Sequence, residues 1–123
     1  SKKNIFKYIL ASDVGVSILK KTNTFKTIYS NKTFDYMACK KPILLAIDGV
    51  SRKLINDAKC GVYVEPENIK SIFNGIKTLM NKSKYDLEKM GISGYEYSKK
   101  YFNKKELSKK YIKSISNFIK NYE

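Results

Sequence analysis

Apolar runs of strand length alternate with helix-length segments through the first half of this chain. Strand character falls on residues 13–19, 42–47 and 61–64, and helix character on the intervening segments 32–39 and 51–58. Parallel strands need a crossover of about a dozen residues or more, usually a helix, and this order supplies the connections. We therefore predict an α/β fold in which helices cover a short parallel sheet of about three strands.

Helical patterns flank this alternation. Residues 4–10 have the pattern of the end of a helix. Asn68 is a typical N-cap, and Ser83 with Asp86 three residues later begins another helix in capping-box fashion. The apolar residues after Asn68 repeat at helical spacing, and we expect them to pack in the core: Ile69, Ile72, Phe73, Ile76, Leu79 and Met80.

The second half of the chain is predicted to be entirely helical. The helix after Ser83 meets Gly91 and Gly94, and a last helix begins at Asn103, with Glu106 completing its capping box. A basic amphipathic helix of this kind packs in a core or lies on a membrane, and we favour packing. Its apolar face consists of Leu107, Tyr111, Ile112, Ile115, Phe118, Ile119 and Tyr122.

Length and charge restrict the classes of function. A chain of 123 residues without an internal repeat or a linker predicts one domain over residues 1–123. The net charge of +14 raises the hypothesis of a nucleic-acid or anionic-membrane partner. All the basic residues except Arg52 are lysines, however, and arginine is the favoured residue for recognising bases and phosphates. We interpret the charge as solvated surface, with peripheral membrane contact as the alternative and no nucleic-acid partner.

The rarer residues exclude several kinds of site. The chain has no histidine, so it lacks the commonest general base and any zinc site built with histidine. Cys39 and Cys60 lie too far apart for metal-ligand spacing, and we expect free thiols, that of Cys39 buried. Unpaired cysteines, no signal peptide and no apolar run of membrane-spanning length predict a soluble, cytoplasmic protein without a bound metal.

The segment 30–43 is the most informative one for function. It reads Ser-Asn-Lys-Thr-Phe-Asp-Tyr-Met-Ala-Cys-Lys-Lys-Pro-Ile, which predicts a short amphipathic helix, a turn and then an apolar strand. This order resembles the nucleotide-sugar-binding segment of the retaining GT-B glycosyltransferases of group 1, the family with a Glu-x7-Glu motif. There the segment runs roughly Pro-(Ser/Asn)-Lys-x-Phe-(Glu/Asp)-Tyr-Met-Ala-x-Gly-Lys-Pro-Ile.

Other segments resemble the same family in the same order, at residues 11–16, 47–55, 60–68 and 101–103. Together they span nearly the whole chain but match only the rear half of the family's C-terminal, donor-binding domain. The resemblance therefore implies a partial Rossmann-like, three-layer domain. The acceptor-binding N-terminal domain and the first strands of the donor domain are missing from it.

The resemblance also implies an activity. The parent protein would transfer a sugar from a nucleoside-diphosphate sugar, with retention, to a glycan or lipid-linked acceptor in surface polysaccharide biosynthesis. It would need no cofactor beyond that substrate. We expect the chain alone to be inactive.

The donor-binding roles fall on a few residues. Asp35 matches the acid that holds the donor ribose, and a carboxylate can accept two hydrogen bonds from a vicinal diol. The resemblance places Thr27, Ser30, Asn31 and Lys32 near the phosphates or the sugar, where a helix N-terminus also favours anions. Thr27 stands in place of the family's first motif glutamate and cannot stabilise positive charge on the sugar. No catalytic residue is assigned.

Two other interpretations stay open. One is a basic α/β module that binds nucleic acid or an acidic partner, although the chain has almost no arginine and no recognisable nucleic-acid motif. The other is an inactive remnant that folds but binds nothing tightly. A truncated parallel sheet exposes an edge, so we also expect self-association of the chain.

Overall fold

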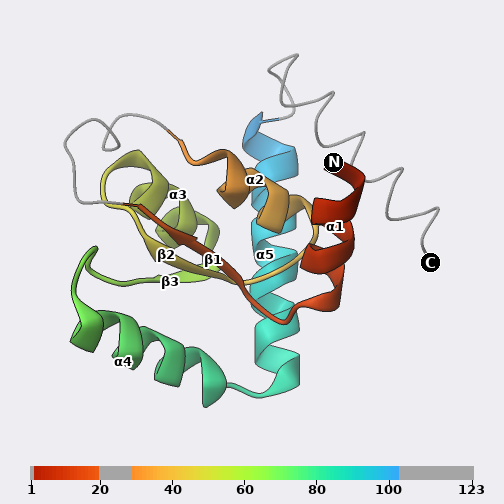
Figure 1. The fold of residues 1–123 in the computed structure, drawn as a ribbon. Coiled ribbons are helices and arrows are strands. Elements are labelled where there is room, and N and C mark those ends of the chain that lie inside the picture. The colour runs from red at the N-terminus through yellow and green to blue at the C-terminus, as the bar shows by residue number, and fades with distance from the viewer. Residues whose placement is uncertain (1, 20–28, 103–123) are drawn as a thin grey trace.

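The computed structural model describes residues 2–19 and 29–102 (Figure 1). All strands in this part of the chain run parallel, in the order β1-β2-β3, which confirms the predicted α/β class with its short parallel sheet and helical second half. Thr27 and the predicted last helix lie outside the described residues. The elements are α1 (Lys2–Ala11), β1 (Gly15–Ile18), α2 (Asn31–Ala38), β2 (Ile43–Ala46), α3 (Val50–Ala58), β3 (Gly61–Tyr63), α4 (Ile69–Met80) and α5 (Lys84–Phe102).

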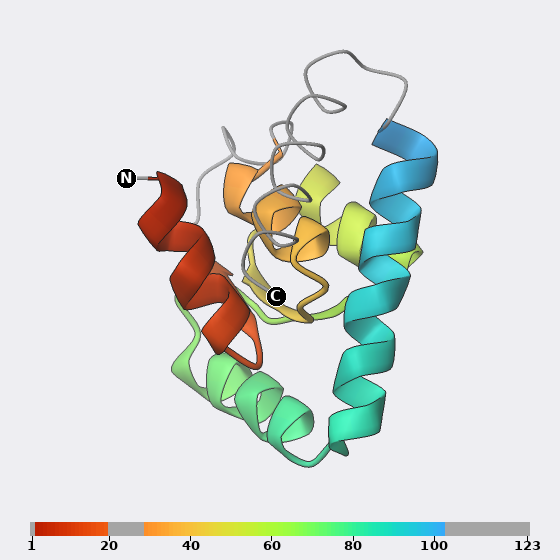
Figure 2. The ribbon, with the colours of Figure 1, turned by 90° about the vertical axis from the view of Figure 1, so that its right-hand side faces the viewer.

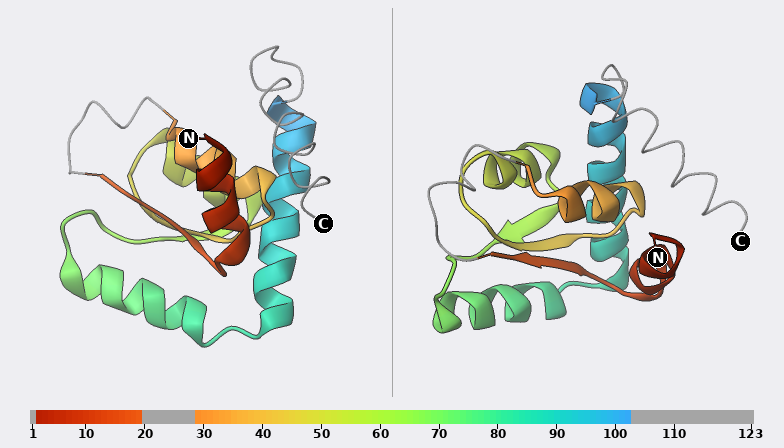
Figure 3. Two further views of the ribbon diagram at one scale, coloured as in Figure 1. Left: turned by 45° about the vertical axis from the view of Figure 1, so that its right-hand side comes forward. Right: turned by 45° about the horizontal axis from the view of Figure 1, so that its top comes forward.

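Helices cover both faces of the sheet. α2 and α3 lie on one face and α4 lies on the other, while α5 packs along α2 and α3 (Figures 1 and 2). Figure 3 shows the same three layers from two further directions. Alternation along β2 sends Ile43 and Leu45 toward α2 and α3, and Leu44 and Ala46 toward α4. β2 is thus buried on both faces, which explains its uninterrupted apolar sequence.

The helix starts predicted at Asn68 and Ser83 are confirmed. The Asn68 side chain accepts a hydrogen bond from the Ser71 amide at 3.0 Å, and the Ser83 hydroxyl accepts one from the Asp86 amide at 3.1 Å. Each cap satisfies an amide of the first turn that has no partner within the helix. Local side-chain chemistry therefore fixes where α4 and α5 begin.

α5 passes Gly91 and Gly94 without a break. A Cβ atom at Gly91 would overlap the backbone oxygen of Lys40, and one at Gly94 would lie 2.7 Å from the Cβ of Cys60. The glycines let α5 lie directly against the turn before β2 and the residue before β3. Close packing is thus the reason for glycine at these helical positions.

The prediction that the whole apolar stripe of α4 packs in the core is wrong. Leu79 is buried and Ile72 is partly buried, and Gly75 lies against the side chains of Val64 and Leu44. These positions define the side of α4 that faces the sheet, and the rest of the stripe lies about 100° around the helix from it. The exposed residues are Ile69 (86%), Phe73 (63%), Ile76 (42%) and Met80 (78%).

Within the described ranges, no helix is both long enough and apolar enough to cross a membrane.

Candidate functional site

A pocket opens at the carboxyl ends of β1 and β2, beside the first turn of α2. Ligands of open parallel sheets bind outside the carboxyl ends of the strands, so this position suits a binding site. The volume of about 220 Å³ lies below the roughly 300 Å³ expected for a whole small-molecule ligand. The pocket therefore fits a part of a ligand, such as a phosphate group. It is lined by Ser17, Ile18, Leu19, Tyr29, Ser30, Asn31, Lys32 and Ile47.

Three serines join the elements around this pocket. The hydroxyls of Ser17 on β1 and Ser30 before α2 lie 3.0 Å apart, and the amide of Ser30 donates to the hydroxyl of Ser51 at 3.2 Å. Ser17 and Ser51 are buried. Ser51 does not cap α3, because the N-cap is Gly49, at φ 91°, and Ser51 lies inside the first turn. Its hydroxyl instead fixes the start of α2.

The first turn of α2 keeps its amides available. Ser30 is the N-cap residue, with an extended backbone, but its side chain makes no capping hydrogen bond and faces Ser17 instead. The amide of Thr33 donates to the Ser30 carbonyl at 3.1 Å, whereas Asn31 and Lys32 are exposed at the helix end. Free amides, the helix dipole and a lysine together favour an anion at this point.

Asp35 lies one turn further along α2 and does not line this pocket. Its position is about 6 Å along the helix axis from Asn31. Cys39, four residues later on the same helix face, packs against Phe6 and Ile9 of α1, so Asp35 lies on the α1 side of α2. One of its carboxylate oxygens is buried. The pocket therefore brings Ser30, Asn31 and Lys32 together, and Asp35 lies outside its lining.

The Asp48-Gly49 pair forms the turn between β2 and α3. The Asp48 carboxylate accepts a hydrogen bond from the Gly49 amide at 2.7 Å and lies 3.4 Å from the Arg52 guanidinium. Arg52 in turn stacks over the Tyr63 ring, 3.9 Å from its centroid. The Asp48 contacts hold this turn and the first turn of α3 together.

The cysteines do not supply a nucleophile. Cys39 and Cys60 are free and buried, as predicted for Cys39, and burial raises the pKa of each thiol to about 12. For Cys39 the negative charge of Asp35 raises the pKa further. Among the described residues, no group of three or more potential ligands could hold a metal ion.

We expect both thiols to resist a thiol-specific reagent at pH 8 in the native chain and to react fully in denaturant, because only the thiolate is a nucleophile. Since folding raises both pKa values above the ordinary value of 9.0, their contribution to stability is complete below pH 9 and is lost as the pH rises toward 12. Urea unfolding between pH 7 and pH 11 measures this loss of stability. Rapid modification of Cys60 in the native state would contradict the raised pKa of its thiol.

Thr33 carries a buried hydroxyl without a hydrogen-bond partner. We expect Thr33→Val to stabilise the fold by about 1 kcal/mol, because valine has the same shape and removes the unsatisfied group. Ser98→Ala is the matched control, since the buried Ser98 hydroxyl donates to the Tyr95 carbonyl at 2.9 Å and its loss should destabilise. Chemical denaturation of both variants tests the opposite signs.

Ser17 was not predicted as a site residue. Alternation along β1 places it, with Gly15, on the face of the sheet that α2 covers, where a polar residue needs a partner. The position of Ser17 on the covered face can be read from the sequence, but its partner Ser30 follows a long connection and cannot. The role of Ser51 is likewise visible only once α2 and α3 are placed side by side.

Comparison of the chain with protein-family models, with curated proteins and with solved structures gave no match.

Proposed function

We propose that this chain is the donor-binding part of a retaining, nucleotide-sugar-dependent glycosyltransferase, and that the start of α2 holds the donor diphosphate. The observation that carries this proposal is the pocket of Ser17, Ser30, Asn31 and Lys32 at the carboxyl ends of the strands. Its uncapped helix amides and its lysine match the charge and size of a phosphate group. The motif in residues 30–43 supports the same assignment.

The proposed chemistry gives this site a role in the reaction. Sugar transfer breaks the bond between the anomeric carbon and the diphosphate oxygen, so negative charge on the diphosphate grows in the transition state. The amides of Asn31 and Lys32, together with the Lys32 ammonium, would stabilise that charge. Groups that bind the acceptor would come from the N-terminal domain of a longer protein.

Asp35 is the proposed ribose anchor. It stands one turn beyond the phosphate pocket, a separation that a nucleoside diphosphate can span. One of its carboxylate oxygens is buried, so the side chain must rotate, or its neighbours must move, before both oxygens can bind the diol. Asp35→Asn keeps the shape and removes the charge, and it therefore separates hydrogen bonding by the carboxylate from packing.

We place the proposed activity in the cytoplasm, with contact at the inner face of the membrane where the acceptor is lipid-linked. The donor and the N-terminal acceptor domain are the proposed partners.

Phosphorus NMR of UDP, GDP and ADP titrated with the chain tests the proposal. We expect one nucleotide to show selective broadening of its diphosphate resonances, and Lys32→Ala to weaken that binding about fivefold through loss of a charge-assisted contact. Lys77→Ala, on the exposed side of α4, is the matched control and should leave binding unchanged. Equal weakening in both variants would indicate unspecific attraction to lysines. No binding of any nucleotide would favour the inactive remnant.

A further inference from the structure

We propose that Ser17 and Ser51 keep the pocket beside α2 open, because they hold Ser30 in a position from which its hydroxyl cannot cap its own helix. Ser17 holds the hydroxyl of Ser30, and Ser51 holds its amide. Both serines act through Ser30 and are therefore positioning residues. The effect on ligand affinity rests on the proposed function, whereas the placement of the Ser30 hydroxyl can be tested without a ligand.

The N-cap position of α2 carries a residue that is able to cap the helix and does not. Serine is a favoured N-cap, because its side-chain oxygen can accept from the amide of the second or third helical residue. Ser30 has the extended backbone that capping requires, yet its side chain makes no such bond. The Thr33 amide donates to the Ser30 carbonyl at 3.1 Å, and no described residue accepts from the Lys32 amide. The Lys32 amide is thus the donor that the Ser30 hydroxyl leaves unused.

Ser17 supplies the competing partner. It lines the pocket from the face of the sheet that α2 covers, is only 3% exposed, and its hydroxyl lies 3.0 Å from that of Ser30. Among the described residues, Ser30 is the sole hydrogen-bond partner of this hydroxyl. A buried hydroxyl without a partner is unfavourable, so Ser17 draws the Ser30 hydroxyl toward β1 and away from Lys32.

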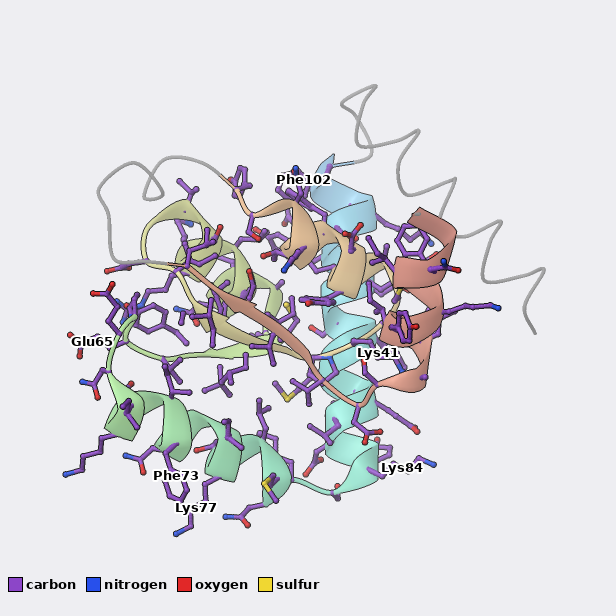
Figure 4. The ribbon with its side chains drawn as sticks, viewed as in Figure 1. Lys41, Glu65, Phe73, Lys77, Lys84 and Phe102 are labelled. Carbon is purple, nitrogen blue, oxygen red and sulfur yellow. The ribbon has the colours of Figure 1, made fainter. Side chains whose placement is uncertain are left out.

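The backbone of Ser30 is held independently of its hydroxyl. Ser51 is fully buried in the first turn of α3, and its hydroxyl accepts from the Ser30 amide at 3.2 Å. Tyr29, the preceding residue, packs edge-on against the ring of Phe102 at a centroid distance of 5.8 Å. Phe102, labelled in Figure 4, lies at the end of α5 beside α2. Loss of the Ser17 hydroxyl would therefore let the Ser30 side chain rotate without moving the helix.

The two orientations of the Ser30 side chain have opposite effects on the pocket. Turned toward Ser17, the side chain leaves the Lys32 amide open to an anion. Turned toward the helix, its oxygen occupies that amide and competes with a phosphate oxygen for the same donor. An N-cap hydrogen bond typically shifts an equilibrium about fivefold, and an anion that needs the same amide should lose affinity by that factor.

Hydrogen exchange of the Lys32 amide with water, measured by NMR on the ligand-free chain, tests this placement. We expect rapid exchange in the unaltered chain and about fivefold slower exchange in Ser17→Ala, because the freed Ser30 hydroxyl then accepts from this amide. The double variant Ser17→Ala/Ser30→Ala has no hydroxyl to cap with and should regain rapid exchange. A Lys32 amide that is protected in the unaltered chain, or unchanged in Ser17→Ala, would overturn the proposal.

Ser98→Ala is the matched control. Ser98 is buried on α5, and its hydroxyl donates to the Tyr95 carbonyl at 2.9 Å, so this variant also loses a buried serine hydroxyl. It should leave the exchange of the Lys32 amide unchanged. Equal slowing in Ser98→Ala and Ser17→Ala would assign the effect to general loss of packing and overturn the proposal. Far-UV circular dichroism confirms that the variants are folded.

Ser51→Ala tests the second positioning residue, whatever the fate of Ser17→Ala. It removes the acceptor of the Ser30 amide, and we expect exchange of that amide to rise at least about fivefold, as for the loss of one hydrogen bond. A Ser30 amide that stays protected in Ser51→Ala would overturn the role of Ser51.

Titration of UDP, GDP and ADP into the same variants measures the effect on binding. For the nucleotide that binds the unaltered chain, Ser17→Ala should raise the dissociation constant about fivefold, and Ser17→Ala/Ser30→Ala should recover most of that loss. A purely structural role of Ser17 would leave the double variant at least as weak as the single one. Equal affinity of the unaltered chain and Ser17→Ala would overturn the inference and leave the donor site intact. Slowed exchange in Ser17→Ala without binding of any nucleotide would overturn the donor site and support the placement of the Ser30 hydroxyl by Ser17.

Discussion

Gly91→Ala is expected to destabilise the fold by about 3 kcal/mol or more, although alanine is the better helix former by about 1 kcal/mol. The added methyl group would overlap the backbone oxygen of Lys40 and crowd the backbone of Lys41. A backbone obstacle cannot rotate away as a side chain can, so α5 must shift away from the turn between α2 and β2. The sign of the effect is therefore opposite to the one that helix propensity predicts.

Urea unfolding of the variant measures this effect. Ile92→Ala is the control at the neighbouring position of the same helix, where the side chain is half-exposed, and it should change stability by less than about 1 kcal/mol. A Gly91→Ala variant as stable as the parent chain would show that α5 does not approach the Lys40 turn closely.

Leu45→Ala is expected to destabilise the fold by about 2–5 kcal/mol. Leu45 is completely buried in the central strand, and it packs in one cluster with Met37 of α2 and Ile55 of α3. Truncation leaves a cavity where the sheet meets both helices. β2 cannot move to fill this cavity, because it is paired with β1 on one side and β3 on the other.

Ile18→Ala is the matched control in the same sheet. Ile18 lies on the edge strand and is 45% exposed, so its truncation should destabilise the fold by less than about 1.5 kcal/mol. Equal losses in the two variants, measured by urea unfolding at low protein concentration, would contradict the assignment of β2 to the centre of the sheet.

The sequence patterns predicted the order of elements well because that order depends on local signals. The apolar run that became β2 and the caps at Asn68 and Ser83 act within a few residues, and the structure has each of them at the expected place. Helix-length connections between the strands were enough to predict parallel pairing.

Features that depend on distant contacts were not predictable in the same way. The serine contacts around Ser30 join three elements, and Gly91 is explained only by the approach of Lys40, far away in sequence. The apolar stripe of α4 has ideal core spacing, yet only the side with Ile72 and Leu79 faces the sheet. Spacing determines which residues share a helix face, while the partner of that face is set by the tertiary structure.

The candidate site was predictable only in part. The motif in residues 30–43 predicted a helix N-terminus with Ser30, Asn31 and Lys32 together, and the structure brings these residues to one pocket. The donor-binding roles of these three residues and of Asp35 all stay predictions. Thr27 lies outside the described residues.

A two-dimensional amide NMR titration of the chain with UDP, GDP and ADP at moderate salt tests the donor-site proposal most directly. The proposal predicts that one nucleotide shifts the amides of Ser30, Asn31 and Lys32 selectively, and that Asp35→Ala abolishes these shifts. Shifts spread over exposed lysines such as Lys70 and Lys77, with no preference among the nucleotides, would contradict a donor site at the start of α2.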